Sequence, residues 1–203
     1  MKNFKFACIR CGNCCTDKNT LVNLTYLDII RIKDGLNLGI NELLDILGFF
    51  IFSDNINNVN RKKMVIEPIA TEKGPAYIAL LKNSLGGCYF YNSEKKKCLI
   101  YKLRPIFCRT FPFSFEVLDD TNSDSKSMIN IFYTEKGKEF CPGISNEAPP
   151  IDIDYWIMIG KKTLDELEKN KNLIKKWNEL VKNGRVYPTV KKFLHMVFEL
   201  NEE

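Results

Sequence analysis

The sequence predicts an α+β fold: a small antiparallel sheet with cysteine-bearing loops, packed helices and a C-terminal helical extension. Short apolar runs with the two-residue period of strands fill the middle of the chain, residues 64–133. Apolar residues with a helical period precede and follow that region. Pro149 and Pro150 interrupt the chain, so we expect a cysteine-cluster metal-binding domain at residues 1–150 and a helical extension packed on it at residues 151–203.

The helix nearest the N-terminus is expected to begin at Thr25. Its side chain can cap a helix, and Asp28 follows three residues later, as in a capping box. Gly35 is the expected end of this helix, because glycine readily adopts the left-handed conformation that closes many helices. A second, short helix is expected after Asn41. Its apolar residues are Leu43, Leu44 and Leu47.

Antiparallel strands are expected in the middle of the chain. The ranges 64–69 and 76–81 flank a turn-forming Lys-Gly-Pro sequence at 73–75. A hairpin is expected around the polar sequence NSEKKK, with strands at 88–91 and 98–101. We expect this hairpin to bring two cysteines together at its open end.

Two further polar segments are interpreted as loops. The range 54–63 separates the early helices from the first strands. The range 119–127 separates a strand at 113–117, where apolar and polar residues alternate, from a partner strand at 128–133.

Two helices are expected after the proline interruption. The first covers about residues 154–182, with apolar residues on one face and mixed charges on the other. Mixed charges of this kind are typical of a solvated surface. The second helix follows Pro188. Their inward residues are Leu167, Ile174, Trp177 and Val181, and then Val190, Phe193, Leu194 and Val197.

The composition is that of a soluble globular protein, with 45% hydrophobic and 27% charged residues among 203. The longest apolar run, residues 46–52, is far shorter than the ~20 residues that span a bilayer. Arg10 and Asn13 interrupt the N-terminal segment, which therefore lacks the apolar core of a secretory signal. We expect a cytoplasmic protein with no membrane partner.

The formal net charge is +5, which is mildly basic. The basic residues are interleaved with acidic ones and form no aromatic–basic stripe, so the pattern disfavours nucleic acid as a partner. A protein partner or redox partner remains compatible with the sequence, which identifies neither.

Eight cysteines against one histidine are the outstanding feature of the composition. In a reducing compartment, closely spaced cysteines indicate metal or redox chemistry more often than disulfides. Cys8, Cys11 and Cys14 form a C-x2-C-x2-C run, and two intervening residues let a tight turn present neighbouring sulfurs to one centre. Bacterial ferredoxins combine such a run with a remote Cys-Pro, which Cys141-Pro142 resembles.

The adjacent cysteines Cys14 and Cys15 are expected to point apart, so that both binding one zinc ion would be strained. They could serve two centres or two irons of one cluster, or one of them could be a spare thiol. Eight thiols could form two four-ligand sites, or one cluster with additional redox cysteines. The cysteines outside the N-terminal run are Cys88, Cys98, Cys108 and Cys141.

Two arginines, Arg104 and Arg109, flank Cys108 and are the candidate cofactor-binding residues. A nearby guanidinium lowers the pKa of a thiol and stabilises an anionic cluster. The same arginines could clamp an anionic substrate or pair with surface carboxylates. The neighbouring aromatic residues are interpreted as core; these are Phe107, Phe111, Phe113 and Phe115.

The sequences CIRCGNCC, Leu-Thr-x2-Asp, GGCYF, CLIYKLRPIFCRTFPF and CPG follow one another in the chain. Together they resemble the YkgJ-type cysteine-cluster family (CxxCxxCC) of zinc- or iron-chelating domains, over about residues 6–143. A related cluster occurs in flagellin lysine-N-methylases. The resemblance implies no catalytic residue, and it implies metal binding by Cys8, Cys11, Cys14, Cys15, Cys88, Cys98, Cys108 and Cys141.

Three functions are compatible with these observations. The favoured one is a metal-binding protein with a cysteine-ligated iron–sulfur cluster, [4Fe-4S], in a redox or cluster-dependent enzymatic role. Zinc in a structural or interaction protein is the alternative, although zinc usually takes two short cysteine knuckles and only one is present. A lysine methyltransferase-like enzyme is the third. It is disfavoured because no glycine-rich loop follows a strand, and Gly86-Gly87 is interpreted as a turn.

Overall fold

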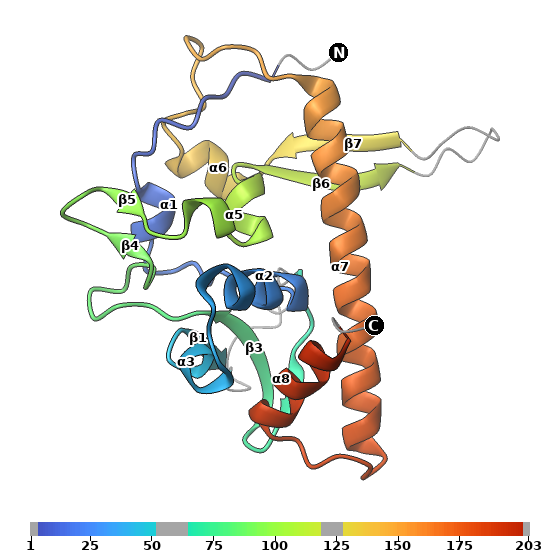
Figure 1. The fold of residues 1–203 in the computed structure, drawn as a ribbon. Helices are drawn as coiled ribbons and strands as arrows, with labels where there is room; N and C mark the ends of the chain where they lie inside the picture. Colours follow the sequence, from blue (N-terminus) through green and yellow to red (C-terminus); the bar gives the residue numbers. More distant parts are fainter. Residues whose placement is uncertain (1–3, 52–64, 119–127, 201–203) are drawn as a thin grey trace.

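The computed structural model describes residues 4–51, 65–118 and 128–200. Helices and short antiparallel strands alternate along these ranges, which confirms the α+β class (Figure 1). The described strands form separate small sheets rather than the single sheet expected. Among the described helices, none combines the length and hydropathy needed to cross a bilayer. The expected loops at 54–63 and 119–127 lie outside the described residues.

Helix α2 (Tyr26–Leu36) begins with the predicted capping box. The hydroxyl of Thr25 accepts the N–H of Asp28, and the Asp28 carboxylate accepts the N–H of Thr25, each at 3.1 Å. The predicted end at Gly35 is wrong, because the helix closes on Asn37 in the left-handed conformation. Gly35 instead leaves room for the side chain of Leu103, which would lie 2.5 Å from a Cβ there.

Helix α3 (Ile40–Leu44) is the short second helix and begins two residues before the start predicted after Asn41. Leu47, expected to belong to it, is instead the first residue of strand β1 (Leu47–Phe50). The sequence pattern did not predict this strand. Its pairing partner lies about thirty residues later in the chain, with Leu47 opposite Leu80.

Strands β2 (Ile69–Thr71) and β3 (Gly74–Leu80) form the first predicted hairpin, and β3 lies between β1 and β2. The predicted strand at 64–69 is wrong in its bounds, because β2 begins only at Ile69. Pro68 has no N–H to donate, and its carbonyl accepts the side-chain amide of Asn178 at 3.0 Å instead of pairing with a strand.

Four of the eight cysteines lie in short helices or strands, and the other four lie outside the named elements. The predicted hairpin around NSEKKK is present, but the predicted strands at 88–91 and 98–101 are wrong in their bounds, because each strand has only two residues, with Tyr91 opposite Cys98. Two further short elements, helix α6 and the 3-10 helix η1, adjoin the cysteine-bearing segments. These elements are α1 (Asn13–Thr16), β4 (Tyr91–Asn92), β5 (Lys97–Cys98), η1 (Tyr101–Leu103), α5 (Ile106–Thr110) and α6 (Glu135–Phe140).

Strands β6 (Phe113–Leu118) and β7 (Met128–Tyr133) pair as predicted, with Phe113 opposite Tyr133. Phe113 is buried in an aromatic cluster, where its ring centroid lies 4.4 Å from that of Trp156. Phe115 is also buried, as expected of a core residue.

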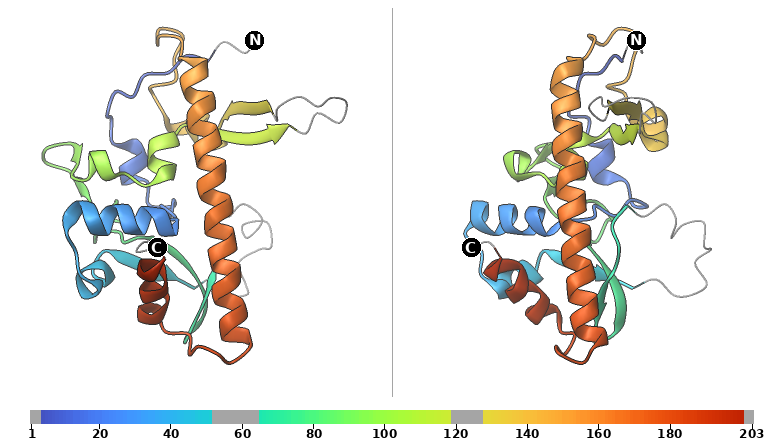
Figure 2. Two further views of the ribbon diagram at one scale, coloured as in Figure 1. Left: turned by 45° about the vertical axis from the view of Figure 1, so that its right-hand side comes forward. Right: turned by 90° about the vertical axis from the view of Figure 1, so that its right-hand side faces the viewer.

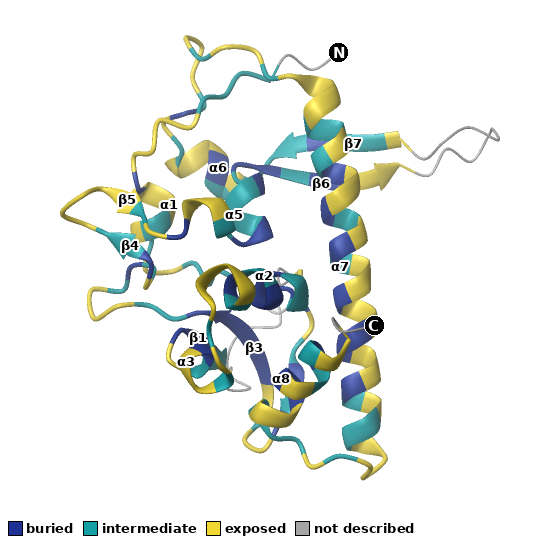
Figure 3. Cartoon of the chain, in the orientation of Figure 1, coloured by how far each residue is buried: buried dark blue, intermediate teal, exposed yellow. Residues whose placement is uncertain are grey.

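Helix α7 (Ile153–Lys182) runs along one side of the molecule, with its buried face turned toward the other elements (Figures 1, 2 and 3). Its N-terminal half packs on β6 and β7, and its C-terminal half packs in the larger core with β2, α2 and α8 (Val190–Glu199). The C-terminal helices therefore supply part of both hydrophobic clusters. The division into domains at residue 150 stays a prediction.

Trp177 is expected to be among the largest single contributors to this core. It is 1% exposed, packs against Phe193, and donates its indole N–H to the carbonyl of Ala70 at 2.9 Å. Trp177→Ala should lower the free energy of unfolding by about 3–5 kcal/mol, measured by urea denaturation. Tyr187→Ala, at a residue that is 65% exposed, should change it by less than about 0.5 kcal/mol. Equal losses in the two variants would contradict this packing.

Candidate metal centre

Three distant segments bring their cysteines to the side of the molecule that faces away from α7 (Figure 1). The N–H of Cys88 donates to the carbonyl of Cys15 at 2.7 Å. The N–H of Ala7 donates to the carbonyl of Gly143 at 3.1 Å. These backbone bonds fix the N-terminal cysteine run against the loops that contain Cys88 and Cys141.

The turn between Cys11 and Cys14 depends on Gly12. This glycine has a φ of 83°, a conformation that other residues rarely adopt. It also lies against Tyr91 of the β4–β5 hairpin, whose hydroxyl would be 2.1 Å from a Cβ at position 12. A glycine is therefore required both by the turn and by the close approach of the hairpin.

The adjacent thiols of Cys14 and Cys15 were expected to point apart, but they lie close together. Their sulfurs lie 4.0 Å apart, within the range of an S–H···S hydrogen bond. This hydrogen bond, with help from the charge of Arg104, lowers the pKa of Cys14 to about 7. The same bond and burial raise the pKa of Cys15. Cys14 is the more exposed of the two and is the stronger candidate for a thiolate.

Cys14 lies at the centre of the electrostatic interactions among the thiols. Burial is the main cause that raises the pKa of the thiols further along the chain, and the charge of Cys14 raises each of them further. Charges act on one another strongly only within roughly 10 Å, so these sulfurs share one region. The thiols affected in this way are Cys88, Cys98, Cys108 and Cys141.

The other two thiols of the N-terminal run are exposed. Cys11 acts on Cys141 and on Tyr91, which places it at the edge of the same region. Cys8 lies three residues before Cys11, at the exposed start of the run. Six thiols thus gather around Cys14. Together with Cys14 they form what we call the thiol cluster: Cys11, Cys14, Cys15, Cys88, Cys98, Cys108 and Cys141.

The thiol cluster has the donor chemistry of a soft-metal site. Thiolates are the ligands of structural zinc and of iron–sulfur clusters, and mutual repulsion of thiolates is relieved by a cation. Within the described ranges, no three cysteine, histidine, aspartate or glutamate side chains surround one point closely enough to hold a metal ion. The donors are gathered in one region without being closed around one centre.

Arg104 faces the thiol cluster. Its guanidinium lies 3.7 Å from the ring centroid of Tyr101 and donates from Nε to the Tyr101 carbonyl at 3.0 Å. From this position its positive charge lowers the pKa of both Cys14 and Cys98. That is the electrostatic effect expected of a cofactor-binding arginine, and direct contact with a cofactor stays a prediction.

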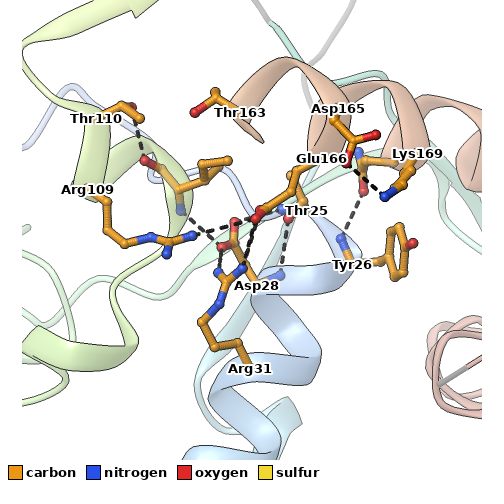
Figure 4. Close-up of polar contacts among 12 residues, drawn as sticks. Thr25, Tyr26, Asp28, Arg31, Arg109, Thr110, Thr163, Asp165, Glu166 and Lys169 are labelled. Atoms are coloured by element: carbon orange, nitrogen blue, oxygen red, sulfur yellow. Dashed lines mark hydrogen bonds and ion pairs between the residues drawn. The ribbon is translucent and has the colours of Figure 1, made fainter. Parts of the chain in front are cut away.

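Arg109, the second candidate arginine, points toward α7 (Figure 4). Its Nη2 lies 3.9 Å from Oε1 of Glu166, a buried carboxylate rather than a surface one. Burial and the neighbouring charge of Arg31 lower the pKa of Arg109. Its Nε atom is buried and has no hydrogen-bond partner among the described residues. The two arginines that flank Cys108 in the sequence therefore have different surroundings.

A fully buried carboxylate, that of Asp28, connects the helix that contains Cys108 to α2. Its Oδ1 accepts the N–H of Ile106, the first residue of α5, at 3.0 Å, and also pairs with Arg31. Burial raises the pKa of Asp28, and the charge of Arg31 opposes that effect. Because Cys108 lies two residues further along α5, Asp28 positions the backbone that presents this thiol.

Arg31 extends the connection to α7. Its Nη2 lies 3.3 Å from both carboxylate oxygens of Glu166, and Asn170, one turn further along α7, accepts the N–H of Tyr26 at 2.9 Å (Figure 4). Glu166 and Asn170 were not among the residues predicted from the sequence. Both continue the helical stripe of Ile174 and Trp177 toward the N-terminus. Polar residues at the positions of an apolar stripe are expected to be buried, and this pattern could have identified them from the sequence.

Comparison with known families agrees with the cysteine pattern. The model of a family described as "Putative zinc- or iron-chelating domain" matches residues 7–142, which include all eight cysteines. The chain belongs to the CxxCxxCC family. Membership of this family supports metal binding, and the description leaves zinc and iron open. The likeness to flagellin lysine-N-methylases stays a prediction.

Among curated proteins, the chain is 30% identical over 118 residues to an uncharacterised protein of Methanocaldococcus jannaschii. The match covers 58% of this chain and 50% of the relative, so this CxxCxxCC protein spans about half the length of that relative. No solved structure matches the chain.

The role of Asp28 in connecting α5 to α2 can be tested by replacing its carboxylate with a neutral amide. Asp28→Asn keeps the shape but cannot accept all three donors, so it should lower the free energy of unfolding by about 3–5 kcal/mol in urea denaturation. Hydrogen exchange at the Ile106 amide should also become faster. Asp165→Asn removes the exposed ion pair with Lys169 and should cost less than about 0.5 kcal/mol. Similar small losses in both variants would show that Asp28 does not hold α5.

Proposed function

We propose that the chain is a metal-binding protein in which the thiol cluster holds an iron–sulfur cluster, [4Fe-4S]. The observation that supports this most is the gathering of distant thiols around Cys14, beside the positive charge of Arg104. An anionic cluster is stabilised by such a charge and by neighbouring backbone N–H groups. When bound, the cluster would supply one-electron chemistry at a potential set by its charge, hydrogen bonds and exposure.

The spacing of the cysteines favours iron–sulfur over zinc, since zinc usually takes two short C-x2-C knuckles and this chain has only the N-terminal run. A [4Fe-4S] cluster and a zinc ion each take four thiolates, so the thiol cluster has more members than either group needs. Neighbouring sulfurs such as those of Cys14 and Cys15 can serve different irons. Remaining thiols, among them the exposed Cys8, would then be available for exchange of metal or electrons.

Structural zinc is the second candidate, because the family description covers zinc as well as iron. Zinc held by four of the thiols would fasten the N-terminal run to the β4–β5 hairpin and α5. In either case the ligands must be reduced, so we place the protein in the cytoplasm. We propose no catalytic residue, and an enzymatic role would come from the cluster.

The metal is identified by anaerobic purification followed by metal analysis and absorption spectroscopy. Iron and sulfide in near-equal amounts, with a broad absorption band near ~400 nm, would support the proposal. A colourless protein with stoichiometric zinc would rule out the iron–sulfur cluster and support structural zinc.

The ligand assignment is tested by Cys14→Ser. Since metal binding is coupled to folding, this variant should lose most of its metal and melt at a lower temperature than the wild type. Asn19→Ser, in the same segment and equally exposed, should retain both properties. Wild-type metal content and melting temperature in Cys14→Ser would exclude Cys14 as a ligand.

A further inference from the structure

The surface around the thiol cluster is both apolar and basic. Ile9, Leu99 and Tyr101 expose 61%, 58% and 37% of their surface, and exposed residues continue through the β4–β5 turn (Figure 3). Exposed or half-exposed cations lie among them. We call these cations the basic rim: Arg10, Lys95, Lys96, Lys97, Lys102 and Arg104.

The basic rim accounts for the charge of the whole chain. Its six cations are accompanied by one acidic residue, Glu94, and the excess of five equals the formal net charge of +5. The other residues therefore contain equal numbers of basic and acidic side chains. Among the described residues, no carboxylate forms an ion pair with a member of the rim.

The outer face of α7 provides a contrast within the same molecule. There, lysines alternate with acids, and Lys169 pairs with Asp165 at 2.8 Å, as predicted for a solvated surface. Acidic residues thus accompany the lysines along α7, whereas the six cations of the basic rim are accompanied by Glu94 alone.

Tyr101 organises two members of the rim. The guanidinium carbons of Arg104 and Arg10 lie 3.7 Å and 4.8 Å from its ring centroid, although the two arginines come from distant segments. Cation–π stacking of this kind restrains the side chains. The restrained guanidiniums are suited to bind carboxylates, which they can contact through two N–H groups at once.

We propose that the basic rim, together with Ile9 and Leu99, docks an acidic protein segment in which carboxylates flank an apolar side chain. This inference rests on the proposed function, because it names the kind of partner that would meet the thiol cluster. The charge of Arg104 reaches Cys14 and Cys98, so a segment bound at Arg104 lies beside these thiols. Docking there would bring a protein partner to the place where metal or electrons are exchanged.

The surface fits a protein better than a nucleic acid. Single-stranded nucleic acid stacks its bases on open aromatic rings, but the ring that lies among the rim's cations, Tyr101, is already covered by two guanidiniums. The exposed aliphatic side chains of Ile9 and Leu99 offer area that protein interfaces bury and that a phosphate backbone does not use.

The test uses the full chain purified with its metal and two fluorescent probes at low salt. One probe is a peptide of repeated Glu-Glu-Leu triplets, and the other is an oligouridylate of the same charge. The triple variant Arg10→Gln/Lys97→Gln/Lys102→Gln should weaken peptide binding by about tenfold in fluorescence anisotropy. Ile9→Ser/Leu99→Ser should weaken binding of the peptide and leave that of the oligouridylate unchanged.

The matched control is Lys161→Gln/Lys162→Gln/Lys175→Gln, which removes three exposed charges from α7. It should change the Kd less than about twofold. Equal effects of the two triple variants, or tighter rim-dependent binding of the oligouridylate, would overturn the proposal. Metal content is measured on every sample. If the protein binds metal but does not bind the peptide, the docking proposal is refuted and the proposed function is not. If the peptide binds through the rim but the chain never binds metal, the proposed function is refuted and the docking proposal is not.

Discussion

The buried carboxylate of Asp28 meets donors from two helix N-termini and from an arginine. It closes the capping box of α2 with Thr25, accepts the first N–H of α5 at Ile106, and pairs with Arg31, which holds Glu166 on α7. A carboxylate without solvent is stable only when such donors are all in place. The presentation of Cys108 therefore depends on a contact made among three helices, by a carboxylate whose charge also raises the pKa of that thiol.

Local signals made much of the fold predictable. The capping residues of α2 lie within four positions of one another, and the apolar stripe of α7 recurs at helical spacing from Leu167 to Val181, about four turns, so both could be recognised without knowledge of distant residues. The end of α2 and strand β1 were missed for the opposite reason. Gly35 is determined by Leu103, and β1 by its pairing with β3, and neither partner is near in sequence.

For the candidate metal centre, too, local features could be predicted from the sequence and long-range contacts could not. Spacing identified the cysteines, but their proximity depends on backbone bonds such as that between Cys88 and Cys15, which spacing does not encode. Arg104 and Arg109 lie on either side of Cys108 in the sequence, which predicted the same role for both. They differ in the fold because Arg104 precedes α5 and stacks on Tyr101, whereas Arg109 lies within α5 and faces Glu166.

The bonds that bring Cys15 against Cys88, and Ala7 against Gly143, connect segments that a ribosome produces at different times. At ordinary rates of synthesis, the N-terminal thiols emerge on the order of 10 s before Cys141. Glu166, which completes the support of α5, emerges later still. During that interval a nascent chain exposes a C-x2-C-x2-C-C run with no neighbouring loops around it. The order of translation thus makes the N-terminal run the first part of the site that any metal donor in the cell can meet.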